Sequence, residues 1–329
     1  MIIDQPSTTT SQVNKKLVEL RETGGAVALG RVLNLVIVTD DGAEVEKAIQ
    51  ASNEASREHP ARVIVVARGA RQAAPRLDAQ IRVGGDAGAS EVLVLRLYGP
   101  LADEGAGSAV PLLLPDAPIV TWWPKDAPEN PAKDPIGALS HRRITDAAAE
   151  VNPIETLQRR AANYAAGDTD LAWTRLTSWR AMLTAAMDLP PHERVTAATV
   201  TGEDDSPSTD LLAAWLAVYL DVPVRRVEHP RGPGIVSASL QRPSGDVEIH
   251  RPDGRVGTLT QPDQPDRRIA LHRREVQDCL AEELRRLDAD EIYEITLRGL
   301  SRIQRGGDDG GDNDDGGEQA AASTAESES

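Results

Sequence analysis

The chain has 329 residues, with 36 basic and 52 acidic side chains and a formal net charge of −16. This length can form two domains with separate cores, and an acidic chain without a basic stripe excludes nucleic acid and anionic membranes as main partners. No apolar run reaches the ~18 residues of a membrane-spanning helix, and residues 1–6 lack the basic and apolar segments of a secretory signal, so we expect a soluble, cytoplasmic protein.

The first part of the chain alternates between helix and strand patterns. Residues 9–21 repeat apolar side chains at helical spacing and predict an amphipathic helix. The apolar stretches 31–38 and 62–67 predict buried strands, and residues 43–58 between them predict a crossover helix. A strand, helix and strand of this length form a right-handed parallel unit, which is the core of an open α/β sheet.

A glycine-rich segment, residues 84–88, separates two alternating strand patterns at 78–83 and 91–97. Glycines that follow a strand are typical of phosphate-binding loops. However, no Lys-Ser or Lys-Thr pair follows, the Gly-x-Gly-x-x-Gly spacing is absent, and a strand comes next. We therefore favour a loop between two antiparallel strands over a phosphate loop.

A tryptophan pair ends the next predicted strand, residues 118–123. Because side chains alternate between the faces of a strand, Trp122 and Trp123 point to opposite sides of the sheet. Either one ring is exposed at the carboxyl end of the sheet, where open α/β sheets have their binding crevice, or helices on both faces bury both rings. The sequence leaves both interpretations open. Residues 125–134 then predict a loop, and 141–146 predict another strand.

Residues 167–189 predict one long helix, with Asp168 as its N-terminal cap and a proline pair at its end. Arg175 projects into the apolar arc of this helix. A guanidinium group buried there needs a carboxylate, so an internal ion pair is favoured over contact with a partner or a ligand. Trp173 and Arg180 share the edge of the arc, where they fit either the rim of a core or an interface anchor.

The second part of the chain starts a new set of elements. A strand, a helix that begins with Ser206-Pro207 and a second strand predict a smaller βαβ unit. Three alternating strands joined by Pro-Ser-Gly and Pro-Asp-Gly turns predict a meander, and two amphipathic helices follow. The predicted strands are 194–200, 222–227, 235–240, 246–251 and 255–260, and the predicted helices are 154–164, 206–220, 273–287 and 290–297.

These patterns predict an α/β protein with two domains. Residues 1–165 form an N-terminal domain with an open, mostly parallel sheet flanked by helices, and residues 166–305 form a smaller α/β or α+β domain with the meander and the C-terminal helices. Residues 306–329 carry eight acidic and no basic side chains, and no apolar residue larger than Ala, which is typical of a disordered acidic tail. In the rest of the chain 44 acidic side chains face 36 basic ones, so the body is only mildly acidic.

The sequence has no motif for catalysis or metal binding. Its six histidines are scattered, and none belongs to a metal-binding pair such as His-Glu-x-x-His. Cys279 is the only cysteine, which excludes an intramolecular disulfide, and its place in a helical pattern favours a buried, unreactive thiol. Asp168 and Asp170 form a close carboxylate pair, but acids are also common at the start of a helix. We therefore predict no catalytic residue, no metal and no cofactor.

Seven short segments carry a resemblance to a known family. They include Trp122-Trp-Pro124, Arg142-Arg-Ile-Thr-Asp146 and Asp170-Leu-Ala-Trp-Thr-Arg-Leu176, and the last is followed by Trp179-Arg180. The others lie at residues 8–17, 30–35, 59–62 and 279–293. In this order the segments resemble the glucose-6-phosphate dehydrogenase assembly protein OpcA family, in its actinobacterial form, from the N-terminus to about Arg302.

The resemblance implies a non-enzymatic partner of glucose-6-phosphate dehydrogenase, which binds the enzyme and promotes its active oligomer in the oxidative pentose phosphate pathway. It supplies no catalytic residue. Cysteine-linked redox control, which is associated with some family members, is not carried over, because Cys279 alone cannot cycle between dithiol and disulfide. Self-association is left open.

An activator needs only to bind the active state of its enzyme better than the inactive state. We predict a contact surface formed by the exposed member of the tryptophan pair together with nearby aromatic and arginine side chains. The alternative is an α/β transferase, or another enzyme, that binds a nucleotide or sugar phosphate at the carboxyl end of the first sheet, with Arg142 and Arg143 holding phosphate. The residues predicted for partner contact are Trp122, Trp123, Arg142, Arg143, Trp173, Arg175 and Arg180.

Overall fold

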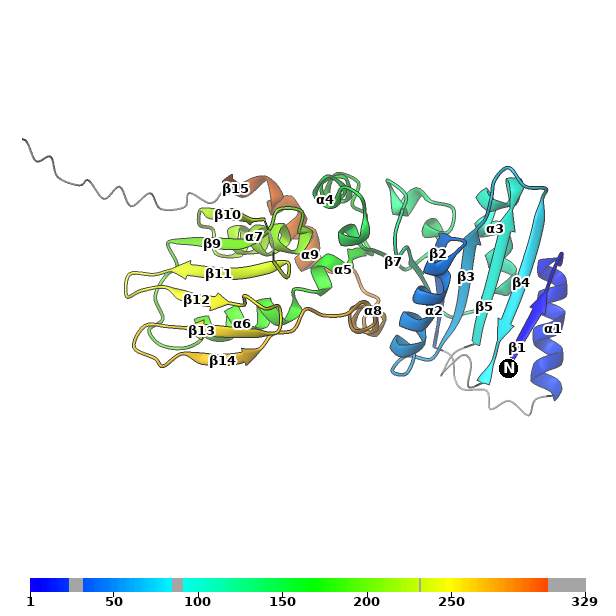
Figure 1. Ribbon diagram of the computed structural model, residues 1–329, viewed down its shortest axis with the longest axis horizontal. Helices are drawn as coiled ribbons and strands as arrows, with labels where there is room; N and C mark the ends of the chain where they lie inside the picture. The colour runs from blue at the N-terminus through cyan, green and yellow to red at the C-terminus, as the bar shows by residue number, and fades with distance from the viewer. Residues whose placement is uncertain (24–31, 85–90, 231, 307–329) are drawn as a thin grey trace, which may run out of the picture.

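The protein has two β-sheets, one in each of two lobes. The computed structural model describes residues 1–23, 32–84, 91–230 and 232–306. Figure 1 shows an elongated molecule in which helices α4 (Pro153–Ala162), α5 (Leu171–Thr174) and α8 (Val276–Arg285) lie between the sheets. The predicted acidic tail beyond Gly306 and residues 85–88 of the glycine-rich segment lie outside the described residues.

The first sheet is open and mostly parallel, as predicted. Its spatial order is β1-β4-β5-β3-β2-β6-β7-β8, in which β1 and β4 are antiparallel additions at one edge. The six parallel strands have the doubly wound order, in which the direction of winding reverses between β2 and β6. The strands are β1 (Ile2–Gln5), β2 (Leu33–Asp40), β3 (Ala61–Arg68), β4 (Arg76–Arg82), β5 (Glu91–Tyr98), β6 (Ile119–Trp122), β7 (Arg142–Thr145) and β8 (Asp168–Asp170).

Helices cover both faces of the first sheet. Helices α2 (Ala43–Ala55) and α8 contribute to one core, and α1 (Thr10–Thr23) and α3 (Gly105–Ala109) contribute to the other. Trp122 belongs to the first core and Trp123 to the second, so the two rings point to opposite sides as predicted. Both are buried, with 2 % and 1 % exposure. The expectation that one ring is exposed is therefore wrong, and the interpretation in which both are buried is confirmed.

The predicted helix over residues 167–189 is wrong. Residues 168–170 form β8, which pairs with β7, and two separate helices follow, α5 and α6 (Thr177–Met187). Asp170, not Asp168, caps α5 by accepting a hydrogen bond from the backbone N–H of Ala172 at 2.9 Å. The same carboxylate accepts from the backbone N–H of Ala147 at 2.9 Å. Pairing with β7 and this contact hold the start of the segment extended, which local helix propensity does not reveal.

The second sheet combines the predicted βαβ unit with the predicted meander. Its order is β14-β13-β12-β11-β9-β10-β15; β9 and β10 are parallel, and β11, β12 and β13 are antiparallel neighbours. Helices α6, α7 (Pro207–Tyr219) and α9 (Glu291–Arg298) contribute to its core. The sequence did not predict β14 or β15. The strands are β9 (Ala197–Glu203), β10 (Val224–His229), β11 (Ile235–Gln241), β12 (Val247–His250), β13 (Val256–Thr260), β14 (Arg267–Ala270) and β15 (Ile303–Gly306).

The chain crosses between the lobes more than once. After β14 it returns to the first lobe, where Cys279, Leu280 and Leu284 of α8 join the core that contains α2. It then enters α9 beside the second sheet, where the Asp290 carboxylate caps the helix by accepting from the backbone N–H of Tyr293 at 2.9 Å. The boundary near residue 165 remains a prediction. Short 3₁₀ turns are η2 (Gly99–Asp103), η3 (Val110–Leu112), η4 (Pro131–Lys133), η5 (Gly137–Leu139), η6 (Ala147–Ala149) and η7 (Gly299–Arg302).

Candidate functional site

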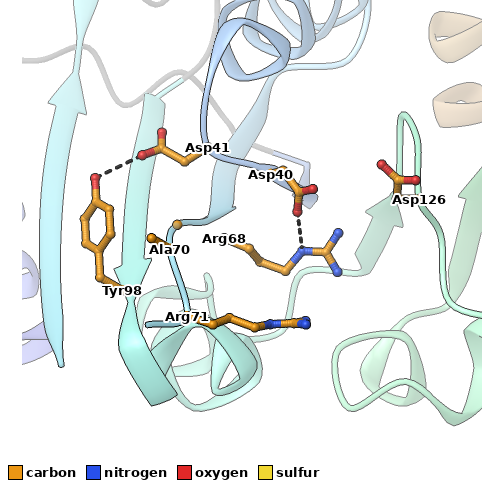
Figure 2. Close-up of a pocket in the computed structure, with 8 residues that line it drawn as sticks. Asp40, Asp41, Arg68, Ala70, Arg71, Tyr98 and Asp126 are labelled. Carbon is orange, nitrogen blue, oxygen red and sulfur yellow. Dashed lines mark hydrogen bonds and ion pairs between the residues drawn. The ribbon is translucent and has the colours of Figure 1, made fainter. Parts of the chain in front are cut away.

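A crevice of about 650 Å³ opens at the carboxyl edge of the first sheet. It lies where β2, β3 and β5 end and where the loop after β6 begins, beside the point at which the winding reverses (Figure 2). Open α/β sheets bind their ligands at this position. We call it the switch-point crevice; its lining residues are Asp40, Asp41, Arg68, Gly69, Ala70, Arg71, Tyr98 and Asp126.

Most polar side chains of the switch-point crevice are bound to one another or to neighbours. Arg68 Nε donates to Asp40 Oδ1 at 3.1 Å, and the Tyr98 hydroxyl donates to Asp41 Oδ2 at 2.9 Å (Figure 2). Arg71 forms an ion pair with Asp103 at 3.1 Å. Partial burial, together with the hydrogen bond to Asp41, raises the pKa of Tyr98. These groups are therefore held in place within the chain and are not arranged as an acid and base around an open position.

The charges at this edge disfavour a bound phosphate. In dinucleotide-binding sheets the pyrophosphate lies on the N-terminus of the helix that follows the first parallel strand, which here is α2. Asp40 and Asp41 precede α2, and Glu44 lies in its first turn. The crevice thus has the position of a nucleotide site, but acidic side chains stand at the start of α2, and the arginines that line the crevice, Arg68 and Arg71, are already paired with Asp40 and Asp103.

Sequence patterns did not single out the residues of this crevice. Asp40, Arg68 and Tyr98 are the last residues of β2, β3 and β5, and all three strands were predicted within a few residues. Because the carboxyl ends of parallel strands meet at one edge, this placement could have indicated the crevice. The antiparallel pairing of β4 with β5 hid the signal, since the sequence does not show that β5 itself lies parallel to β3.

A buried polar network, which we call the joint, connects the two lobes. Arg142 Nε on β7 donates to Glu283 Oε2 on α8 at 2.8 Å, and both side chains are 5 % exposed. The other oxygen of Glu283 accepts from the Thr174 hydroxyl of α5 at 2.5 Å. Arg143 forms an ion pair with Asp168, and Arg175 forms one with Asp146. The joint consists of Arg142, Arg143, Asp146, Asp168, Asp170, Thr174, Arg175 and Glu283.

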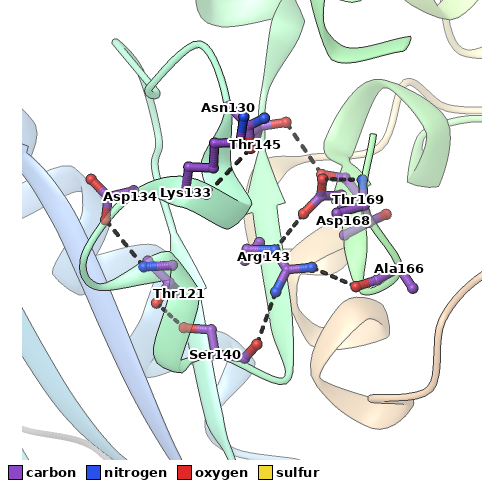
Figure 3. A network of polar contacts seen from close by, with 12 residues as sticks. Thr121, Asn130, Lys133, Asp134, Ser140, Arg143, Thr145, Ala166, Asp168 and Thr169 are labelled. Atoms are coloured by element: carbon purple, nitrogen blue, oxygen red, sulfur yellow. Dashed lines mark hydrogen bonds and ion pairs between the residues drawn. The ribbon is translucent and has the colours of Figure 1, made fainter. Parts of the chain in front are cut away.

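Arg143 has every arm of its guanidinium group occupied (Figure 3). Nε is bound to Asp168, Nη1 donates to the Ser140 carbonyl at 2.9 Å, and Nη2 donates to the Ala166 carbonyl at 2.5 Å. Arg142 is satisfied in a similar way, since its Nη1 donates to the Asp288 carbonyl at 2.6 Å. Neither arginine is free to hold phosphate in this structure, which removes the phosphate-binding role that the enzyme alternative gave them.

Arg175 has the internal ion pair that the sequence favoured. Its Nη1 and Nη2 each donate to one oxygen of Asp146 at 2.7 Å, a bidentate arrangement. The Asp168–Asp170 pair, considered for acid–base chemistry, is part of the joint. Asp170 is fully buried and accepts from Thr145 at 2.6 Å and from backbone N–H groups. Both carboxylates therefore have structural partners.

Five of the seven residues predicted for partner contact are buried in this structure. Trp122, Trp123 and Trp173 lie in the cores, and Arg142 and Arg143 lie in the joint. Their placement corrects the expectation of a surface built from them, because a buried side chain cannot touch a partner directly. The Arg175 side chain is only 11 % exposed and is paired with Asp146, whereas Arg180 is half-buried. Of the seven residues, only Arg180 is both partly exposed and without an ion pair among the described residues.

Arg180 differs from the arginines of the joint. Its guanidinium carbon lies 3.8 Å from the centroid of the Trp173 ring, and Trp173 Nε1 in turn donates to Asp290 at 2.8 Å. Arg180 donates to the Thr177 hydroxyl at 3.4 Å, and its buried Nε has no hydrogen-bond partner in the described part of the chain. Burial lowers the pKa of Arg180. Among the described residues this partly desolvated cation forms no ion pair, although Asp290, Glu282 and Glu283 lie near enough to act on its charge.

The single thiol lies away from both the crevice and the surface. Cys279 is fully buried in α8, as the sequence predicted, and burial raises the pKa of its thiol to about 12. Among the residues that the structure describes, no cluster of three or more His, Cys, Asp or Glu side chains is placed to hold a metal ion. Within the same residues, no helix has both the length and the apolar character needed to cross a membrane.

Solved structures with some likeness to the chain include three dehydrogenases and reductases. KijD10, a 3-ketoreductase from Actinomadura kijaniata in complex with NADP, has 8 % identity and a TM-score of 0.40, over 84 % of this chain and 99 % of that one. Glucose-6-phosphate 1-dehydrogenase from Mycobacterium avium has 10 % identity and a TM-score of 0.38, over 84 % and 94 %. The WlbA dehydrogenase from Bordetella pertussis, in complex with NADH and UDP-GlcNAcA, has 12 % identity and a TM-score of 0.37, over 83 % and 95 %.

Two family models match the chain in consecutive order. Both describe a subunit of glucose-6-phosphate dehydrogenase: the model of its N-terminal domain matches residues 52–162, and the model of its C-terminal domain matches residues 166–297. No curated protein matches. The two matches cover most of both lobes and confirm the resemblance seen in the sequence. The chain belongs to the glucose-6-phosphate dehydrogenase assembly protein OpcA family.

Proposed function

We propose that this protein binds glucose-6-phosphate dehydrogenase and promotes the enzyme's active oligomer, without catalysing a reaction of its own. The observation that carries the proposal is the pair of family models, both named for a subunit of that dehydrogenase, over residues 52–162 and 166–297. The proposal places the protein in the cytoplasm, together with the dehydrogenase and its pathway.

The geometry of the molecule supports a binding role. The switch-point crevice carries Asp40 and Asp41 where a nucleotide would bring its phosphates, and its hydroxyl and guanidinium groups already have partners. The two arginines that could have held phosphate are buried in ion pairs with Glu283 and Asp168. An assembly factor needs no nucleophile, because differential affinity for two states of its partner is sufficient to shift their populations.

The direct test mixes the purified full-length protein with glucose-6-phosphate dehydrogenase from the same organism. Light scattering would follow the mass of the complex, and NADPH formation would follow the turnover of the dehydrogenase. We expect a larger assembly and a higher turnover per dehydrogenase protomer. An unchanged mass together with unchanged turnover would contradict the proposal.

The enzyme alternative makes a different prediction. A transferase or dehydrogenase would bind a nucleotide or a sugar phosphate in the switch-point crevice, so its melting temperature would rise with NADP⁺, UDP-glucose or glucose 6-phosphate. From the carboxylates at that edge we expect no rise with any of the three ligands. A rise that disappears in an Arg68→Ala variant would support the alternative.

A further inference from the structure

An apolar groove of about 210 Å³ lies between α6 and α7 on the helical face of the second sheet. The two helices do not close over the sheet at this point. Leu240 of β11, which is 1 % exposed, lines it together with side chains from both helices. We call it the aromatic groove; its lining residues are Leu183, Thr184, Met187, Trp215, Leu216, Tyr219, Leu220 and Leu240.

Two aromatic side chains make one wall of the aromatic groove accessible. Trp215 and Tyr219 lie one turn apart on α7, with their ring centroids 6.2 Å apart. Trp215 is half-buried and Tyr219 is 46 % exposed. Trp and Tyr dominate the energetic centres of protein interfaces, because each covers a large apolar area while keeping a polar atom. The groove therefore has the composition of a contact surface. Unlike Trp122 and Trp123 of the first lobe, which are buried, its aromatic side chains are accessible to a partner.

A cation lies next to the aromatic groove along α6. Arg180 precedes Leu183 and Thr184 by one helical turn, and residues at this spacing lie on the same side of a helix. Three carboxylates act on its charge from nearby, and each is engaged elsewhere: Asp290 accepts from Trp173, Glu282 from Arg274 and Glu283 from Arg142. The guanidinium group of Arg180 is therefore a positive charge that the described part of the chain leaves without an ion-pair partner.

We propose that the aromatic groove docks a segment of the partner dehydrogenase that places apolar side chains over Trp215 and Tyr219 and a carboxylate against Arg180. This inference rests on the proposed function. Complementarity identifies the occupant: an apolar floor needs apolar side chains, and an unpaired guanidinium group at its end needs an acid. The acidic tail of the chain itself does not fit, since it offers carboxylates but no apolar residue larger than Ala.

The test compares two neighbouring substitutions on α6 in the full-length protein. Thr184→Glu places a carboxylate in the aromatic groove, and Ala185→Glu places the same charge on the next residue, which does not line it. Both positions are exposed, so both variants should fold, which circular dichroism would verify. Titration calorimetry with the purified dehydrogenase should show affinity reduced about tenfold or more for Thr184→Glu, and within about twofold of wild type for Ala185→Glu.

A second pair of variants tests the carboxylate. Arg180→Met keeps a long side chain over Trp173 but removes the charge, whereas Arg180→Lys keeps the charge. We expect weaker binding and a smaller salt dependence for the Met variant, and partial retention of both for the Lys variant.

The outcomes separate this inference from the proposed function. If the wild type binds the dehydrogenase and Thr184→Glu binds as tightly as Ala185→Glu, the docking site is wrong and the function stands. If the wild type does not bind at all, both fail together. A dimer of this protein alone that Thr184→Glu dissociates and Ala185→Glu does not would identify a second copy as the occupant, which also overturns the inference.

Discussion

The joint between the lobes gives the strongest prediction about stability. Glu283 on α8 is the carboxylate shared by Arg142 of β7 and Thr174 of α5, and it is 5 % exposed. Glu283→Ala would leave the Arg142 guanidinium group buried, with only the Asp288 carbonyl still accepting from it. Because an uncompensated buried charge is costly, we expect the free energy of unfolding to fall by about 3–5 kcal/mol.

The neighbouring residue provides the matched control. Glu282 is also on α8 and also forms an ion pair, with Arg274 at 2.5 Å, but its side chain is 33 % exposed. Water can solvate Arg274 after Glu282→Ala, so we expect a loss of about 1 kcal/mol or less. The two variants remove the same group from the same helix, and they differ in burial and in the partners that are lost.

Urea unfolding followed by tryptophan fluorescence measures the free energy of unfolding of each variant, because five tryptophans are distributed over both lobes. The double variant Arg142→Met, Glu283→Leu should recover most of the loss, since it removes both charges and fills their volume. A Glu283→Ala protein that is within about 1 kcal/mol of wild type would refute the reasoning, because it would mean that water reaches Arg142 in the folded state.

Three further predictions follow from single positions. Because burial raises the pKa of the Cys279 thiol to about 12, we expect no reaction with a disulfide reagent at about pH 8 until urea unfolds the protein. Gly137→Ala places a Cβ 1.9 Å from the backbone carbonyl oxygen of Pro131, so we expect the melting temperature to fall by several degrees. Gly107→Ala is the control. Its Cβ would meet only a side-chain oxygen of Glu104 at 3.9 Å, so we expect the melting temperature to stay unchanged or to rise. The hydrogen bond from Arg82 lowers the pKa of Glu46 from 4.5, so this pair stabilises the fold above pH 4.5 and the contribution is lost as the pH falls through the lowered pKa. Glu46→Gln should remove that part of the pH dependence, by less than about 1 kcal/mol because the side chain is largely exposed.

The elements with local signals could be predicted from the sequence. Apolar runs located β2 and β3, Ser206 caps α7 as expected, and the Pro-x-Gly turns predicted the meander. The short edge strands β1, β14 and β15 were missed, because four residues carry little periodicity and their pairing partners are distant in the chain or lie across an irregular turn. The local sequence pattern was therefore sufficient to predict the long helices and strands. It was insufficient to predict short strands that exist only through pairing with a distant segment.

The candidate site residues were misplaced for a related reason. A Trp or an Arg is equally typical of an interface and of a satisfied interior, and the difference depends on partners elsewhere in the chain. The partner of Arg142 is Glu283, which lies 141 residues further along the chain. The partner of Arg143 is Asp168, which lies 25 residues further along. Asp170, predicted to be part of a helix, is instead held extended by β7 and Ala147. The ion pair of Arg175 was predictable because the apolar arc around it already demanded a carboxylate.

The joint and the aromatic groove are linked through α5. Thr174 binds Glu283 within the joint, and its neighbour Trp173 supports the guanidinium group of Arg180 at the end of the groove. A loosened joint would therefore displace the ring beneath Arg180, whereas a charge placed at Thr184 would leave the joint intact. Glu283→Ala should weaken dehydrogenase binding together with stability, and Thr184→Glu should weaken binding alone. If Glu283→Ala lowers stability but binds with wild-type affinity, the position of Arg180 does not depend on the joint.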